Sequence, residues 1–312
     1  MPLAKKKPVA RPASAHADKP FRGIALVLLA TVFLGTSDVT SKYLSATLPS
    51  IEIAWIRFLV FLLIMSPALL PGTRFYALPT RRAGLLLVRS TALMASAIFF
   101  ISGLRFIPIA EASATSFVSP LFVTALSIFL LKESVGLRRW LATAAGLVGV
   151  LIVLRPGTSA FHPAALFSLV SALAWAVTLV LTRKMSGEPA LTLMAYASIV
   201  GFAIMSALVP FVWVTPSWHD IFFGVVVGLA STMGQWVVVL AFRYANASVL
   251  APFSYTQLLW VSFLGVIIFG EVPDVWTMTG AAIIVTSGLY TAHRERLRRS
   301  EVIAQAELSP NP

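Results

Sequence analysis

The chain has 312 residues, of which 58% are hydrophobic and 12% are charged, and its mean hydropathy is +0.87. Because a soluble domain carries about 25% charged residues, this composition excludes an ordinary soluble protein and indicates a membrane protein. The net charge is +12, but the basic residues are sorted by membrane side, so we expect no nucleic-acid partner. No cysteine is present, which excludes disulfide bonds, thiol catalysis and cysteine metal sites.

Ten apolar runs approach the ~20 residues that a helix needs to cross a ~30 Å hydrocarbon core. They are too long for β-barrel strands and lack the alternation of such strands. The connections between them are too short to hold a soluble domain. The sequence therefore predicts an all-α membrane protein with ten transmembrane helices. In chain order the runs cover residues 23–43, 51–70, 83–104, 109–131, 139–155, 163–183, 190–213, 219–242, 247–270 and 274–292.

The two ends of the chain differ from the runs between them. Residues 1–20 are rich in Pro, Ala and Lys and predict a disordered basic tail, and residues 293–312 predict a cytoplasmic C-terminal tail. A signal peptide is the competing interpretation of the first run. We disfavour it because that run is long, carries Asp38 and Lys42, and lacks a clear cleavage site of small residues.

The basic residues predict how the chain is oriented. If the N-terminus is cytoplasmic, all but five of the 24 lysine and arginine residues fall in the tails or near cytoplasmic span ends. Lys42, Arg105 and Arg155 then lie on the opposite side, and Arg57 and Arg89 lie inside spans. This bias predicts a multi-pass plasma-membrane protein, in a bacterium the inner membrane, with both termini in the cytoplasm.

The sequence repeats itself once, half a length apart. Residues 83–135 align without a gap on residues 221–273, and this alignment places Glu133 on Glu271 at the end of an apolar run in each copy. Pairs further upstream match with slightly larger shifts, among them Lys42 with Lys184, Thr40 with Thr182 and Pro49 with Pro189.

The repeat predicts two units, residues 21–156 and residues 157–292, each with five spans. Because five is an odd number, the two units enter the membrane from opposite sides and form an inverted repeat about a pseudo-two-fold axis in the membrane plane. If the two units differ slightly in shape, exchanging those shapes turns an inward-open cavity into an outward-open one. The alternative is a duplicated but rigid bundle that transports nothing.

A pattern of prolines, glycines, aromatic and polar residues runs through both copies, at Pro49, Trp55, Arg57, Ser119-Pro120, Lys132-Glu133, Gly146, Gly149, Trp175, Lys184, Gly270-Glu271, Gly280 and Gly288. At these residues the chain resembles the drug/metabolite transporter superfamily, specifically the ten-helix type with two EamA domains, over residues 21 to 292. The resemblance implies movement of small metabolites, often export of amino acids, without a cofactor, and exporters of aromatic amino acids are among the members. Two departures are Phe33, where a Trp is common, and Leu258, where a proline is expected.

Three charged residues at membrane depth form a candidate gate or proton-sensitive site. Asp38 and Lys42 lie one turn apart on the first span, and Arg57 enters the second span at a similar depth. An ion pair of Asp38 with Lys42 or with Arg57 is therefore expected. Both pairs have a structural alternative, in which they lock two helices together or Lys42 extends to the interface.

Polar and aromatic residues within the spans predict a substrate cavity between the two copies, near the midplane. The alternative is that these groups only form hydrogen bonds and packing contacts between neighbouring helices. Because Trp, Tyr, Phe and hydroxyl groups suit an amphipathic metabolite, we favour a cavity bounded by the first, third and fourth spans and by the sixth, eighth and ninth. The candidate substrate-binding residues are Trp175, Ser231, Gln235, Trp236, Ser254, Tyr255, Gln257, Ser116 and Ser119.

Together with this resemblance, the sequence predicts a secondary transporter that exports amino acids and related small metabolites by alternating access, with aromatic amino acids as the candidate substrates that the resemblance suggests. No Walker A loop, nucleophile turn or metal-ligand spacing is present, so we expect neither an enzyme nor a cofactor. The expected partners are a small-molecule substrate and membrane lipid, and the expected state is a monomer. Alternatives are a multidrug effluxer, a membrane enzyme and a scaffold, and transport by facilitated diffusion or by proton coupling both stay open.

Overall fold

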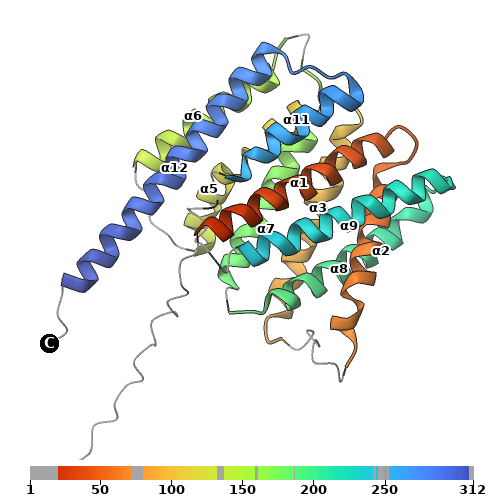
Figure 1. The fold of residues 1–312 in the computed structure, drawn as a ribbon, viewed down its shortest axis with the longest axis horizontal. Helices are drawn as coiled ribbons and strands as arrows, with labels where there is room; N and C mark the ends of the chain where they lie inside the picture. The colour runs from red at the N-terminus through yellow and green to blue at the C-terminus, as the bar shows by residue number, and fades with distance from the viewer. Residues whose placement is uncertain are drawn as a thin grey trace, which may run out of the picture.

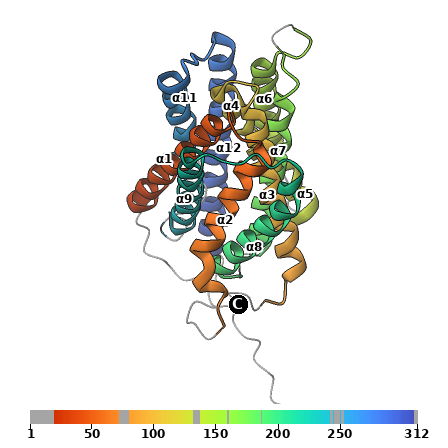
Figure 2. The same ribbon diagram turned by 90° about the vertical axis from the view of Figure 1, so that its right-hand side faces the viewer.

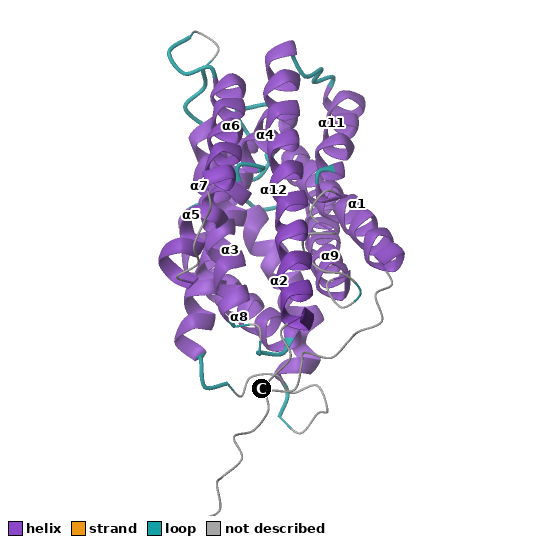
Figure 3. Ribbon diagram, turned by 90° about the vertical axis from the view of Figure 1, so that its left-hand side faces the viewer, coloured by secondary structure: helices purple, strands orange, loops and turns teal. Residues whose placement is uncertain are grey.

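The computed structural model describes residues 20–71, 80–131, 137–158, 161–185, 187–241, 244, 250 and 253–308. Within these ranges every regular element is a helix, as Figure 3 shows. Seven segments there are long and apolar enough to cross a membrane, and three shorter apolar helices accompany them. The all-helical, ten-span fold predicted from the sequence is therefore confirmed.

The helices follow the predicted spans, except that in the ninth span, residues 247–270, the described helix α11 covers only Thr256–Phe269, and residues 247–249 and 251–252 lie outside the described part. The fourth span is divided into α4 and α5, and the last helix continues well beyond residue 292. The elements are α1 (Pro20–Leu44), α2 (Ser50–Leu69), α3 (Ala83–Leu104), α4 (Ile109–Ser116), α5 (Ser119–Leu131), α6 (Leu137–Leu154), α7 (Ala165–Lys184), α8 (Ala190–Leu208), the 3₁₀ turn η1 (Val209–Phe211), α9 (Trp218–Ala241), α11 (Thr256–Phe269) and α12 (Val275–Leu308).

Several predictions concern residues outside the described part. They concern the basic tail before residue 20, the last four residues, and Arg74, Lys132, Glu133 and Arg243. What the sequence predicts for these residues stays a prediction. The predicted C-terminal tail is helical as far as Leu308, because α12 continues without a break from the last span.

The break between α4 and α5 has a local cause. Phe117 and Val118 separate the two helices, and Pro120 stands in the first turn of α5. Proline has no backbone N–H and disfavours the helical conformation of the residue before it, so a helix that reaches Pro120 ends early and restarts. The break places Ser116, Phe117 and Ser119 at an irregular point of the backbone.

Helix directions establish that the two repeats are inverted. Lys42, near the end of α1, donates to the carbonyl of Ile107, just after α3, so α1 and α3 end on the same side of the bundle. Ser168, near the start of α7, lies beside Gly103 at the end of α3, whereas Thr182, near the end of α7, bonds Arg89 at the start of α3. Therefore α7 runs antiparallel to α3 and also to its own counterpart, α1.

The helix neighbours obey the same two-fold relation. Helix α1 packs against α9 and α11, and its counterpart α7 packs against α3 and α5. Two further pairs, α2 with α8 and α6 with α12, relate each helix to its own counterpart. Figure 1 shows these two pairs at opposite edges of the bundle, and Figure 2 shows α2 and α8 together at the front.

Glycines allow α2 to pack closely against the second repeat. Gly224 and Gly228 of α9 face Ile56 and Val60 of α2, each with a separation of four residues. A Cβ atom on Gly224 would lie 2.8 Å from the Ile56 side chain, which is too close for an ordinary contact. This G-x-x-x-G arrangement brings the backbones together, as small residues do between membrane helices.

Candidate functional site

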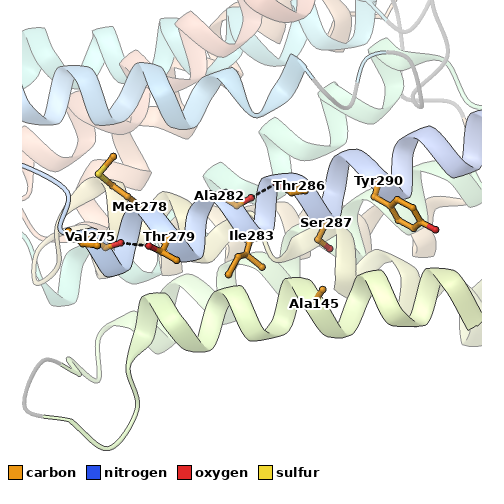
Figure 4. A pocket seen from close by; sticks show the side chains of 9 residues that line it. All are labelled: Ala145, Val275, Met278, Thr279, Ala282, Ile283, Thr286, Ser287 and Tyr290. Atoms are coloured by element: carbon orange, nitrogen blue, oxygen red, sulfur yellow. Dashed lines mark hydrogen bonds between the residues drawn. The ribbon is translucent and has the colours of Figure 1, made fainter.

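Two hollows among those in the described structure differ clearly in character. The larger, about 910 Å³, runs along α12 beside α6 and is shown in Figure 4. Its lining is mostly apolar and carries no charged side chain, with Met278, Ile283 and Tyr290 among the residues drawn. It lies far from the interface at which α1, α3, α7 and α9 meet. A membrane protein presents such surface to lipid.

The second hollow is a polar cavity of about 190 Å³ at the centre of the bundle, between the repeats. We call it the central cavity. It draws side chains from α1, α2, α3, α4, α5, α7, α9 and α11, so both repeats contribute. The lining residues are Leu34, Asp38, Arg57, Leu93, Ser96, Ala97, Phe100, Ser113, Ser116, Phe117, Ser119, Ser171, Ala172, Trp175, Gln235 and Gln257.

Asp38 is the single carboxylate in this lining, and it is held by one amide. Gln257 Nε2 donates to Asp38 Oδ2 at 2.9 Å, which links α1 to α11 across the two repeats. The other carboxylate oxygen, Oδ1, has no hydrogen-bond partner among the described residues. Leu34, one turn earlier on α1, lines the cavity beside it because residues four apart share a helix face.

Arg57 is the single basic residue in the lining. Its guanidinium makes no hydrogen bond and no ion pair with any described residue. It interacts electrostatically with Asp38, but no Arg57 nitrogen lies within 4.0 Å of an Asp38 oxygen. The cavity thus holds two opposite charges that face the same space without bonding directly to each other.

Hydroxyl groups line the side of the cavity formed by α3, α4 and α7. Ser96 and Ser171 bond to each other across α3 and α7, with an Oγ–Oγ distance of 3.2 Å, so their bonding capacity is used within the bundle. Ser116 Oγ, in contrast, is buried and has no hydrogen-bond partner among the described residues. A buried hydroxyl without a partner costs about 1–3 kcal/mol, so Ser116 is a group that a ligand or water would satisfy.

Aromatic side chains complete the cavity. Trp175, Phe100 and Phe117 lie in the lining, and the Trp175 indole N–H has no hydrogen-bond partner among the described residues. Tyr255 is buried outside the lining and packs on Phe117, with 5.1 Å between the ring centroids. Its hydroxyl lies against Gly288 of α12, a position that only a residue without a Cβ leaves open.

Of the predicted substrate-binding residues, the central cavity brings together Trp175, Gln235, Gln257, Ser116 and Ser119. The structure places the others elsewhere. Ser231 bonds the carbonyl of Gly228 at 3.1 Å and lines a much smaller void beside the cavity. Trp236 is 43% exposed, because it follows Gln235 by about 100° around α9 and points outward. Ser254 and Tyr255 are not in the lining, and Tyr255 packs against the lining residue Phe117.

The predicted ion pair between Asp38 and Lys42 is not formed. Lys42 Nζ donates instead to Glu271 Oε1 at 2.5 Å and to the carbonyl of Ile107 at 2.9 Å. Glu271 Oε2 accepts from the backbone N–H of Ile109 at 3.0 Å. Lys42 lies one turn nearer the helix end than Asp38, where Glu271 offers a partner that the sequence spacing within α1 does not reveal.

The contacts of Lys42 and Glu271 form what we call the end clasp. It joins α1, the end of α11 and the connection between α3 and α4, at the end of the bundle where Arg155 also bonds Asp274 at 2.8 Å. The side chains of Lys42 and Glu271 are 10% and 24% exposed. In the alignment of the two repeats, Lys42 corresponds to Lys184 and Glu271 corresponds to Glu133. Glu133 lies outside the described residues.

Sequence reasoning overlooked several residues of the central cavity. Ser96 and Phe100 lie four residues apart on α3, and Ser171 and Trp175 lie four apart on α7. This i, i+4 pairing of a hydroxyl with an aromatic ring, on two helices that pack against each other, was available in the sequence. It identifies which face of each helix is turned toward the partner repeat.

An inverted pair of five-helix repeats around a polar cavity is the architecture of a secondary transporter. Comparison with known proteins agrees with this class. The EamA-like transporter family matches residues 21–155 and 162–291, so the chain belongs to that family and is a multi-pass membrane transporter. Each match covers one of the five-helix repeats.

Named relatives cover almost the whole chain. An S-adenosylmethionine uptake transporter of Rickettsia prowazekii (strain Madrid E) is 31% identical over 278 residues, which are 88% of this chain and 93% of the relative. A riboflavin transporter of Vibrio cholerae is 28% identical over 294 residues, which are 91% of this chain and 98% of the relative. These relatives are transporters and not enzymes, and they act on small molecules.

A crystal structure of a protein with 18% sequence identity shares the fold. The TM-score is 0.61, and the match covers 87% of this chain and 97% of the other. At this level of identity the similarity concerns the arrangement of helices alone.

Proposed function

We propose that this transporter moves small metabolites that carry an α-amino acid group, including amino acids and S-adenosylmethionine-like compounds, through the central cavity. The single observation that supports this most is the presence of Arg57 and Asp38 in one cavity without a direct ion pair. Alternating access, with both termini in the cytoplasm of a bacterial inner membrane, remains part of this proposal and rests on the inverted repeat and the positive-inside bias.

The electrostatics of the cavity favour this class over lipophilic cations. A charge inside a membrane protein requires a compensating partner, and Arg57 makes no direct ion pair with any described residue, Asp38 included. A free guanidinium repels a cationic drug and attracts a carboxylate. Asp38 alone would attract a cation, so it is the two charges together that favour a zwitterionic substrate, whereas the aromatic lining taken alone would also suit a drug.

The volume of the central cavity limits the size of the substrate that fits in the conformation described here. Pockets for drug-sized ligands measure roughly 300–1,000 Å³, whereas the central cavity measures about 190 Å³. A single amino acid is a better match to this volume than S-adenosylmethionine or riboflavin. A larger substrate requires the repeats to separate, which is what alternating access provides.

Transport by purified protein in vesicles tests the proposal. We expect saturable uptake of labelled phenylalanine, methionine or S-adenosylmethionine, and none of a lipophilic cation such as tetraphenylphosphonium. Empty vesicles are the control for leakage. Transport of riboflavin or of the lipophilic cation, with no transport of the three amino acid compounds, would contradict the proposed substrate class. Reversing the gradient in the same vesicles tells whether the protein favours export or uptake.

A further inference from the structure

Opposite charges in the central cavity belong to different helices of the first repeat. Asp38 is on α1 and Arg57 is on α2, whereas the second repeat contributes the amides Gln235 and Gln257. The inverted repeat therefore does not duplicate the charges. The cavity therefore carries one acidic and one basic side chain, on different helices.

We infer that these residues recognise the two ends of a zwitterionic head group, with Arg57 binding the substrate carboxylate and Asp38 binding its ammonium group. This inference rests on the proposed function and assigns roles within the same cavity. The inference goes beyond the proposed function because it predicts which part of the substrate each residue contacts.

Arg57 has the chemistry for its role. The guanidinium presents five N–H donors in a planar fork that matches a carboxylate, and none of these donors is used by a described residue. A bidentate bond to a carboxylate satisfies two donors and compensates the buried charge. Lysine at this position keeps the charge but loses the fork.

Asp38 has a matching free acceptor. Gln257 occupies Oδ2 and fixes the orientation of the carboxyl group, which leaves Oδ1 without a partner among the described residues. Gln257 thus acts as a positioning residue for Asp38. A primary ammonium donates three hydrogen bonds, and it finds Oδ1 of Asp38 and the unpaired hydroxyl of Ser116 among the groups that line this cavity.

The aromatic part of a substrate meets the remaining side of the cavity. Trp175, Phe100 and Phe117 offer ring faces, and such faces stabilise both an aromatic side chain and a nearby cation. Substrates that differ only behind the head group therefore share the Arg57 and Asp38 contacts. The head group sets the class, and the aromatic side sets the preference within it.

Three compounds with the same ring separate the two contacts. Phenylalanine carries both charges, phenethylamine lacks the carboxylate, and 3-phenylpropionate lacks the ammonium group. Binding is measured with purified protein by titration calorimetry, and inhibition of labelled phenylalanine uptake is measured in vesicles. The variants are Arg57→Gln, Arg57→Lys and Asp38→Asn, with Thr215→Ala in an exposed loop as the matched control.

For the unchanged protein we expect phenylalanine to bind about 10- to 100-fold more tightly than either analogue, the range for one charge-assisted bond. Arg57→Gln removes the preference over phenethylamine and leaves the affinity for phenethylamine intact. Arg57→Lys restores part of the preference. Asp38→Asn removes the preference over 3-phenylpropionate. Thr215→Ala changes none of these ratios.

The outcomes distinguish the two levels of the proposal. Equal binding of phenylalanine and phenethylamine by the unchanged protein, with phenylalanine still transported, overturns the head-group inference and leaves the proposed function standing. Equal weakening of all three compounds by Arg57→Gln also overturns it, because a purely structural residue has that effect. Failure to bind or transport phenylalanine, methionine and S-adenosylmethionine contradicts the proposed function itself, together with the head-group inference.

Discussion

At the scale of single residues, the end clasp shows how an ionic group is stabilised at the end of a membrane span. Lys42 would leave an uncompensated charge at the border of the apolar region, but Glu271 and the carbonyl of Ile107 both accept hydrogen bonds from it. Glu271 in turn satisfies the N–H of Ile109 at the start of α4, where the first backbone donors of a helix lack partners. One carboxylate therefore stabilises two separate features.

Removing one member of the clasp leaves the other without its partner. We expect Glu271→Gln or Lys42→Met to lower the free energy of unfolding by about 1.5–3 kcal/mol, the range for hydrogen bonds to charged groups. The double variant should lose less than the sum of the two, because each single change already breaks the shared bond. Thermal unfolding in detergent measures both. Strict additivity would show that the two residues do not interact.

At the scale of helices, glycines decide how closely the repeats approach. A Cβ atom at Gly228 would overlap the side chain of Val60, and Val60 is β-branched, which restricts how it can turn away. The same close approach recurs where Gly201 of α8 faces Phe58. The contact of α2 with α8 and α9 therefore depends on small residues in the second repeat.

Adding one methyl group at this contact tests that dependence. We expect Gly228→Ala to lower the free energy of unfolding by about 1–3 kcal/mol through overpacking, and Val60→Ala in the same chain to recover most of the loss. Gly84→Ala is the matched control, because nothing lies within 4 Å of its added Cβ atom. Thermal unfolding in detergent compares the variants. A stable Gly228→Ala protein would mean that the helices are not in close contact there.

At the scale of the whole molecule, the inverted repeat makes equivalent loops lie on opposite sides of the membrane. Ala46, between α1 and α2, lies on the same end of the bundle as Thr215, between α8 and α9. Gly187 lies in the loop between α7 and α8, which is the loop of the second repeat equivalent to the α1–α2 loop that holds Ala46. The α7–α8 loop lies at the opposite end of the bundle, where Thr80 donates a hydrogen bond to Glu188.

Absence of native cysteines makes this arrangement directly measurable. The variants Ala46→Cys, Thr215→Cys and Gly187→Cys each introduce one thiol in a position that is exposed in the structure. With a membrane-impermeant maleimide added to intact cells, we expect labelling at 46 and 215 and not at 187. Lysed cells, in which all three should react, provide the control. Labelling of 46 and 187 from the same side would contradict the inversion.

The sequence alone determined the spans, the repeat and the polar character of the interior. These features depend on the length of each apolar run and on whether the number of spans in a repeat is odd or even. Both can be counted in the amino-acid sequence without knowing the fold. It also indicated Trp175, Gln235 and Gln257 as candidates, because polar residues inside an apolar run are costly wherever they point.

Only the tertiary structure decided which of these residues face one another. Gln235 and Trp236 are neighbours in the chain, yet Gln235 lines the central cavity and Trp236 is turned outward. The reason is that successive side chains of an α-helix point about 100° apart around its axis. Lys42 bonds Glu271, 229 positions away, in place of Asp38 one turn away. Such choices depend on how neighbouring helices are placed, and that placement is set by packing between the repeats.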